Sequence, residues 1–99
     1  MTLHIVNRSP TQSDALDSCI RRAQPGNAIL LIEDAIYALL ILEQLFSKHQ
    51  KLSQLEIYAL AEDVTARGAS QWCTEQIRLV DYQGFVALTE HYPSSLSWY

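Results

Sequence analysis

The feature that most constrains the fold is a run of five apolar residues, AILLI, at positions 28–32. A strand with one face in water alternates apolar and polar residues, whereas a strand that is covered on both faces is apolar throughout. Pro25-Gly26 precede the run and Glu33-Asp34 follow it, so its limits are clear. The run therefore predicts a strand inside a parallel sheet, with helices packed on both faces.

The rest of the chain alternates short apolar runs with helical patterns. Further strands are predicted at 3–6, 57–61 and 77–80, and helices within 9–23, 34–48, 62–67 and 82–92, followed by a tail. This alternation indicates an α/β fold, because parallel strands need helical crossovers. We expect a three-layer α/β/α sandwich with a mainly parallel sheet of four to five strands. The 99 residues suffice for a single domain, 1–99, and not for two.

Local signals mark the first and last helices. Ser9 as N-cap, Pro10 at the first helical position and Gln12 three residues after Ser9 predict the start of the first helix. Apolar residues at spacings of three and four predict its buried face: Ala15, Leu16, Cys19, Ile20 and Ala23. The last helix carries a similar stripe, made of Phe85, Leu88 and Tyr92.

The second helix is apolar around its whole circumference between positions 35 and 42. A helix on a sheet needs only one apolar stripe, so its outer side would expose large apolar side chains to water. The composition agrees, because 48% of the residues are hydrophobic and only 18% are charged, against about 25% in ordinary soluble domains. We expect a subunit interface over this helix, although scattered exposed apolar residues are common. The candidate residues are Ile36, Tyr37, Leu39, Leu40 and Ile41.

The charge balance argues against several classes of partner. The formal net charge is −4, and the basic residues are scattered, with Arg21-Arg22 as the only adjacent pair. Direct nucleic-acid binding needs a basic surface, and binding to a membrane surface needs a basic amphipathic segment. The longest fully apolar run has eight residues, far short of the roughly 20 of a membrane span. The N-terminus shows no signal-peptide pattern, so we expect a cytoplasmic protein.

Acidic pairs follow two of the predicted strands, Glu33-Asp34 and Glu62-Asp63, at the sheet edge where ligands of parallel sheets bind. No glycine-rich loop follows the first strand, which argues against a third interpretation, a nucleotide- or flavin-binding module. No cofactor is expected. Acid–base catalysis by these carboxylates is one interpretation. Helix capping or ion pairing by Asp34 and Asp63 is the favoured one.

The three histidines, His4, His49 and His91, lie on separate elements and share no metal-ligand spacing, so no metal site is expected. His4 lies inside a predicted strand and is interpreted as a core residue whose hydrogen bonds are satisfied. His49 is interpreted as a solvated residue at the end of a helix.

Two cysteines, Cys19 and Cys73, are too few for a disulfide framework and are expected as free thiols. Cys19 shares the apolar face of the first helix, where a cysteine behaves as a small hydrophobic residue. The nearby Arg21 and Arg22 leave open a second role, as an auxiliary thiol. Cys73 precedes the fourth strand in a more exposed loop, and nothing nearby in the sequence activates it.

Four segments together resemble the TusB/DsrH family: LHIVNRSP, LLIEDAIYA, IYALAEDVTARG and LVDYQGFVALTEHYPSSLSW. They extend from the first strand to Trp98. Their order and spacing, with a tryptophan almost at the C-terminus, are more specific than any one segment. The resemblance implies the DsrE-like fold, which is a three-layer α/β/α sandwich.

The resemblance also implies partners. Members of the family join TusC/DsrF-like and TusD/DsrE-like subunits in a heterohexamer with two copies of each chain. The complex relays persulfide sulfur from a TusA-type carrier to a TusE/DsrC-like acceptor, toward 2-thiolation of the wobble uridine in tRNA. In sulfur-oxidising bacteria the related complex serves cytoplasmic sulfur trafficking in the Dsr pathway. We expect the tRNA pathway, because it is the more widespread setting of the family.

The resemblance further implies an accessory role. The main sulfur-accepting cysteine belongs to the TusD/DsrE-type subunit, where it follows the third strand ahead of an Arg-Gly pair. The matching stretch here, residues 60–63 before Arg67-Gly68, has two carboxylates and no thiol. Some DsrH-type members carry a cysteine where Cys19 stands, which leaves an auxiliary role for Cys19 open. The alternative of another class is an autonomous sulfurtransferase that uses Cys19. Ala35 departs from the family pattern, since relatives often have Gly after the acidic pair.

Overall fold

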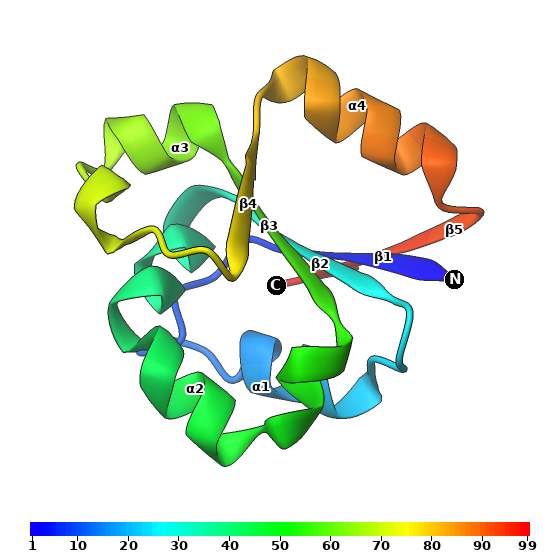
Figure 1. The fold of residues 1–99 in the computed structure, drawn as a ribbon, viewed down its shortest axis with the longest axis horizontal. Helices are drawn as coiled ribbons and strands as arrows, with labels where there is room; N and C mark the ends of the chain where they lie inside the picture. The colour runs from blue at the N-terminus through cyan, green and yellow to red at the C-terminus, as the bar shows by residue number, and fades with distance from the viewer.

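The computed structural model describes residues 1–99 and contains one five-stranded sheet in which all strands are parallel (Figure 1). The order across the sheet is β4-β3-β2-β1-β5. The strands are β1 (Thr2–Val6), β2 (Ala28–Leu31), β3 (Glu56–Leu60), β4 (Ile77–Val80) and β5 (Ser94–Trp98). The predicted α/β class and parallel sheet are confirmed. β5 is an addition, because it forms where the sequence predicts only a tail.

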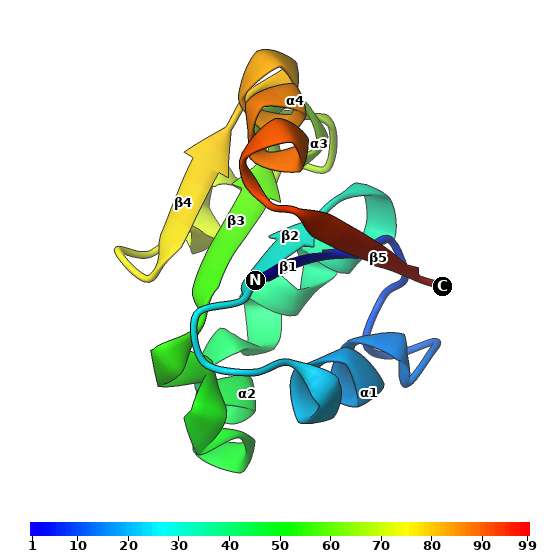
Figure 2. The same ribbon diagram turned by 90° about the vertical axis from the view of Figure 1, so that its right-hand side faces the viewer.

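Helical segments cover both faces of the sheet (Figure 2). One face carries α1 (Ala15–Arg22), the 3-10 helix η1 (Glu33–Ile41), α2 (Leu42–Lys48) and the 3-10 helix η2 (Gln50–Gln54). Two short helices, α3 (Ala61–Ala66) and η3 (Ser70–Trp72), connect β3 to β4, and α4 (Tyr82–His91) lies on the opposite face. The β4–β5 connection returns across the sheet, so a right-handed crossover places α4 on that opposite face. No helix in the chain is both long and apolar enough to span a bilayer.

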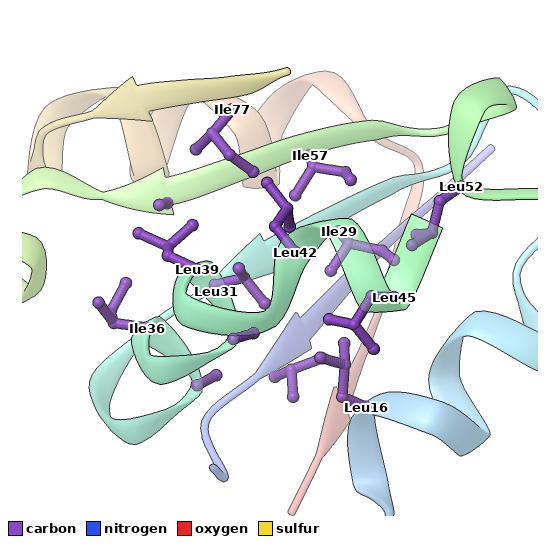
Figure 3. Close-up of a cluster of buried hydrophobic side chains, with 14 of the residues drawn as sticks. Leu16, Ile29, Leu31, Ile36, Leu39, Leu42, Leu45, Leu52, Ile57 and Ile77 are labelled. Atoms are coloured by element: carbon purple, nitrogen blue, oxygen red, sulfur yellow. The ribbon is translucent and has the colours of Figure 1, made fainter. Parts of the chain in front are cut away.

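The two faces of the sheet are buried to different degrees. A cluster of 20 buried residues lies on the side of α1, η1 and α2, and Figure 3 shows part of it. The other cluster has four buried residues, Leu3, Ala28, Leu30 and Tyr92, and α4 has no fully buried residue. β2 contributes to both clusters, as the apolar run at 28–32 predicts. The first face therefore supplies most of the apolar burial that stabilises the fold.

The predicted start of the first helix is wrong, although its buried face is confirmed. The carbonyl of Ser9 accepts hydrogen bonds from the amides of Gln12 and Ser13 at 3.1 Å each, which closes a turn. The helix begins at Ala15, whose amide donates to Ser13 Oγ at 3.0 Å. The signature of Ser9, Pro10 and Gln12 therefore belongs to a turn that precedes the helix.

The predicted helix at 34–48 is divided into η1 and α2. A 3-10 helix has three residues per turn, so every third residue lies on the same side. Ile36 and Leu39 are 0% and 4% exposed, and they belong to the large cluster (Figure 3). Tyr37 and Leu40 lie on the other side and are 36% and 53% exposed. The uniformly apolar segment therefore has one buried and one exposed side.

Polar contacts connect α1 to the end of α2 and to the segment that follows it. Asp17 accepts hydrogen bonds from His49 Nε2 at 2.8 Å and from Lys48 Nζ at 3.2 Å. The bond from His49 is the main cause of a lowered pKa of the Asp17 carboxyl. Lys51 Nζ donates to the carbonyls of Ile20 and Arg21 at the end of α1, where a cation is favourable. The interpretation of His49 as a solvated residue is wrong, because its side chain is 11% exposed and bonded to Asp17.

His4 is a buried residue with both ring nitrogens bonded, as predicted. Trp98 Nε1 donates to His4 Nδ1 at 3.1 Å, and the His4 Nε2 to Asn27 Oδ1 distance is 3.0 Å. Because the indole nitrogen can only donate, Nδ1 is the acceptor and Nε2 carries the hydrogen. These bonds join β5, β1 and the residue that precedes β2.

Because η1 has one buried and one exposed side, substitutions on the two sides should differ in their effect on stability. We expect Ile36→Ala to lower the free energy of unfolding by about 2–5 kcal/mol, because it removes a fully buried side chain from the core. Leu40→Ala, in the same helix, should cost less than about 1 kcal/mol, because that side chain is half exposed. Urea unfolding followed by circular dichroism measures both values. Equal losses would contradict the 3-10 arrangement.

Candidate functional site

The loops at the carboxyl ends of the strands form the edge at which a parallel sheet binds ligands. We call this edge the rim. It contains Glu33 and Asp34 after β2, Glu62 and Asp63 at the start of α3, and Asp81 after β4. The hydrogen-bond partners of each acidic side chain indicate whether the rim has a catalytic or a structural role.

Asp63 and Arg67 connect α3 to the start of η1. The backbone N–H of Glu33 donates to Asp63 Oδ2 at 2.6 Å. Arg67 donates from Nε and Nη2 to Asp34 Oδ1 at 3.2 and 3.0 Å, and its Nη1 lies 3.8 Å from Asp63 Oδ1. The favoured prediction of ion pairing by Asp34 and Asp63 is confirmed.

Glu33 adopts a backbone conformation that few residues other than glycine use. Its φ is 50°, in the left-handed region. The hydrogen bond from its N–H to Asp63 holds this turn, through which the chain leaves β2 and enters η1. The strain is therefore supported by α3, an element about 30 residues further along the chain.

Glu62 and Asp81 also serve the backbone. Glu62 Oε2 accepts a hydrogen bond from the N–H of Tyr82 at 3.1 Å. Asp81 is the N-cap of α4, and its Oδ1 accepts from the N–H of Gly84 at 2.8 Å. The rim acids thus hold loops and helix ends in place, so the geometry favours a structural role for the rim over acid–base chemistry.

The two thiols lie away from the position that follows β3. Cys19 is fully buried beneath α1, and desolvation raises the pKa of its thiol to about 12. Cys73 follows η3, is half-buried, and its Sγ lies 3.9 Å from the carbonyl oxygen of Ala69. Ala61 and Glu62 occupy the turn after β3. The turn after β3 therefore contains no cysteine that could act as a thiolate nucleophile.

Apolar side chains lie next to the rim: Tyr37 and Leu40 are exposed, and Ile41 is half-buried. We call Tyr37, Leu40 and Ile41 the η1 ridge. Two hollows border it, and Leu40 and Ile41 line both. One, of about 300 Å³, lies between the ridge, Asp34 and the turn at 9–12. The other, of about 350 Å³, lies between η1, the start of α2 and residues 71, 72 and 74. A ridge between two hollows offers a shape into which a partner surface can fit.

The structure keeps only some of the sequence-predicted interface residues at the surface. Tyr37, Leu40 and Ile41 belong to the ridge, whereas Ile36 and Leu39 pack in the chain's own core and have almost no surface to offer. The turn at 9–12, which forms a wall of the first hollow, was not among the predicted site residues. Its Ser-Pro-Thr-Gln sequence resembles the start of a helix, so the sequence alone does not indicate that the turn lines a hollow.

Solved structures define the class of fold. The chain matches the ychN protein from E. coli with a TM-score of 0.72 at 14% identity, covering 97% of each chain. It also matches protein Tm0979 from Thermotoga maritima with a TM-score of 0.68 at 25% identity, covering 92% of this chain and 93% of that one. The predicted DsrE-like α/β/α sandwich is confirmed.

The chain belongs to the TusB/DsrH family. Residues 8–95 match the family model described as DsrH like protein. Proteins named TusB from Pectobacterium parmentieri, Serratia proteamaculans and Escherichia coli K12 are 33%, 35% and 34% identical to it. Each match covers 97% of this chain and 99% of the relative. The family is one of sulfur-relay subunits.

The difference between the two thiols is testable by alkylation. At pH 8, four units below a pKa of about 12, roughly one Cys19 thiol in ten thousand is ionised, and the thiolate is the reactive form. We expect iodoacetamide to modify Cys73 in the native protein while Cys19 stays unmodified. Mass spectrometry of peptides measures both sites, and labelling in urea, where both react, is the control. Native labelling of Cys19 at the rate seen in urea would contradict its burial.

Proposed function

We propose that this chain is a structural subunit of a heterohexameric sulfur-relay complex. The complex would pass persulfide sulfur toward 2-thiouridine at the wobble position of tRNA, with TusC/DsrF-like and TusD/DsrE-like chains as the other subunits. A TusE/DsrC-like protein would accept the sulfur from the complex, in the cytoplasm. Family membership supports this setting.

The observation that carries the structural role is the occupation of the rim by carboxylates. Asp34 and Asp63 share Arg67, and Glu62 binds the backbone of Tyr82, at the place where the family's sulfur-bearing subunit has its cysteine. Neighbouring carboxylates oppose ionisation of a thiol. The sulfur is therefore carried by another subunit, and this chain contributes shape and contact surface without binding tRNA or a cofactor.

The η1 ridge is the proposed contact with a related subunit. Tyr37 and Leu40 are exposed apolar residues beside two hollows, as in the core of an interface. Ile36 and Leu39 act indirectly, because they fix η1 on the sheet and thereby orient the ridge.

Two alternative functions remain, and the observations favour only one of them. The matched family description, DsrH like protein, favours a role in cytoplasmic sulfur oxidation, with dissimilatory sulfite reductase genes nearby as its sign. An autonomous sulfurtransferase would need Cys19 as its nucleophile. The burial of Cys19 and its raised pKa speak against that function.

A cysteine-free variant tests the structural role. The test uses a bacterial strain from which the gene for its own TusB-type protein has been deleted. We expect the double variant Cys19→Ala, Cys73→Ser to restore wobble 2-thiouridine to the same level as the unchanged chain does. Neither thiol would be needed if a partner carries the sulfur. Mass spectrometry of tRNA nucleosides gives the readout. Loss of thiolation by a variant that still folds and still co-purifies with its partners would contradict the proposal.

Charge substitution tests the ridge. We expect Leu40→Lys to reduce co-purification with the related subunits at least about tenfold, because it places a charge in an apolar contact. Leu79→Lys, on β4, is the matched control, since Leu79 is 50% exposed and Leu40 is 53% exposed. The co-expressed complex is isolated through a tag on a partner, and the amount of this chain is measured. Equal recovery of both variants would exclude the ridge as the contact.

A further inference from the structure

β5 is the most exposed strand of the sheet. Ser94, Ser95, Leu96 and Ser97 are all exposed, and Leu96 retains 46% of its surface. Figure 2 views the molecule toward this side, and β5 lies at the edge of the sheet with no element beyond it. An exposed strand at the edge of a sheet offers its free backbone groups to another strand.

The backbone groups that face outward can be assigned. The N–H of Asn7 donates to the carbonyl of Trp98 at 3.4 Å, so the Trp98 carbonyl points toward β1. Successive residues of a strand point their N–H and C=O groups to opposite sides. Leu96 therefore also points toward β1, whereas Ser95 and Ser97 point away from it. Their two N–H and two C=O groups form an open ladder edge.

The two edges of the sheet differ in protection. β4 carries Arg78, whose side chain is 66% exposed, with Glu75 before the strand and Asp81 after it. Charges of this kind discourage pairing at an edge. Residues 92–99 contain no charged side chain, and β5 contains no proline. In a chain with a net charge of −4, β5 is where two copies can approach with little repulsion.

Leu96 lies at the centre of β5, between Ser95 and Ser97, whose backbone groups both face outward. We propose that β5 pairs with β5 of a second copy of this chain, antiparallel, with Leu96 on the twofold axis. Ser95 of one copy then exchanges two N–H···O bonds with Ser97 of the other, and the symmetric pair repeats this. A contact in which both partners use the same patch is the usual form of a twofold dimer.

This register also covers the exposed Leu96 side chains and explains where the hydrogen-bonded ladder ends. The two Leu96 side chains meet on the face that carries α1 and cover one another. The next outward position before Ser95 is Pro93, which has no N–H to donate, so the ladder ends there. The result is one sheet that continues through both copies. This pairing does not depend on the proposed sulfur-relay function, because it follows from the strand itself.

Disulfide trapping tests the register. In a Cys73→Ser background, Leu96→Cys places two thiols on the axis, where Cα atoms of opposed residues lie about 4.5 Å apart, within disulfide range. We expect a covalent dimer after mild oxidation. Ser94→Cys is the matched control, because position 94 opposes 98 and its two copies are roughly 13 Å apart. Cross-linking at 94 with none at 96 would overturn the pairing.

The oligomeric state tests the contact without new thiols. Sedimentation velocity of the unchanged chain should show a concentration-dependent dimer. Leu96→Lys and Ser97→Pro should each raise the dissociation constant of the dimer about tenfold or more. Leu96→Lys places two like charges opposite each other, and Ser97→Pro removes an outward N–H. Leu79→Lys, on the other edge, should leave it unchanged. A chain that stays monomeric at every concentration, a dimer indifferent to Leu96→Lys, or a dimer lost with Leu79→Lys would each overturn the proposal.

Discussion

Burial of apolar side chains on one face of the sheet is the constraint on which the rest of the structure depends. The large cluster joins β2 and its neighbouring strands to α1, η1 and α2, whereas the α4 face has four buried residues. A domain of this size buries a limited fraction of its surface, so most of the stabilisation must come from one well-packed side. Both proposed contact surfaces, the η1 ridge and the β5 edge, consist of groups that this core leaves at the surface.

The parts of the fold that depend on local pattern could be predicted from the sequence. The apolar runs at 3–6, 28–32 and 57–61 predict β1 to β3, because strands inside a covered sheet need such residues. The pattern at 77–80, which includes Arg78, predicts β4, which lies at an edge of the sheet. β5 could not be predicted in this way, since three of its five residues are serine and its conformation comes from pairing with β1. η1 was mistaken for an α-helix because a segment that is apolar on every side hides the period of three.

The candidate site shows the same division. The positions of the rim acids follow from the strand ends, and their ion pairing was the favoured interpretation. The choice of partners was not predictable, because Arg67 lies 33 positions from Asp34 and meets it only in the folded chain. A parallel sheet whose rim is occupied by bonded carboxylates retains the architecture of its class.

The pairing of β1 with β5 has a consequence for biosynthesis. β1 is the first of the five strands to be translated and β5 the last, yet they are neighbours, with Thr2 opposite Ser94 and Val6 opposite Trp98. Until Trp98 leaves the ribosome, one side of β1 has no neighbour and the acceptor nitrogen of His4 has no indole to bind. A nascent chain must therefore keep an open strand and a polar ring exposed until β5 has emerged, a state that favours aggregation. The sheet is therefore completed only after β5 has been made, although its partner strand β1 is made first.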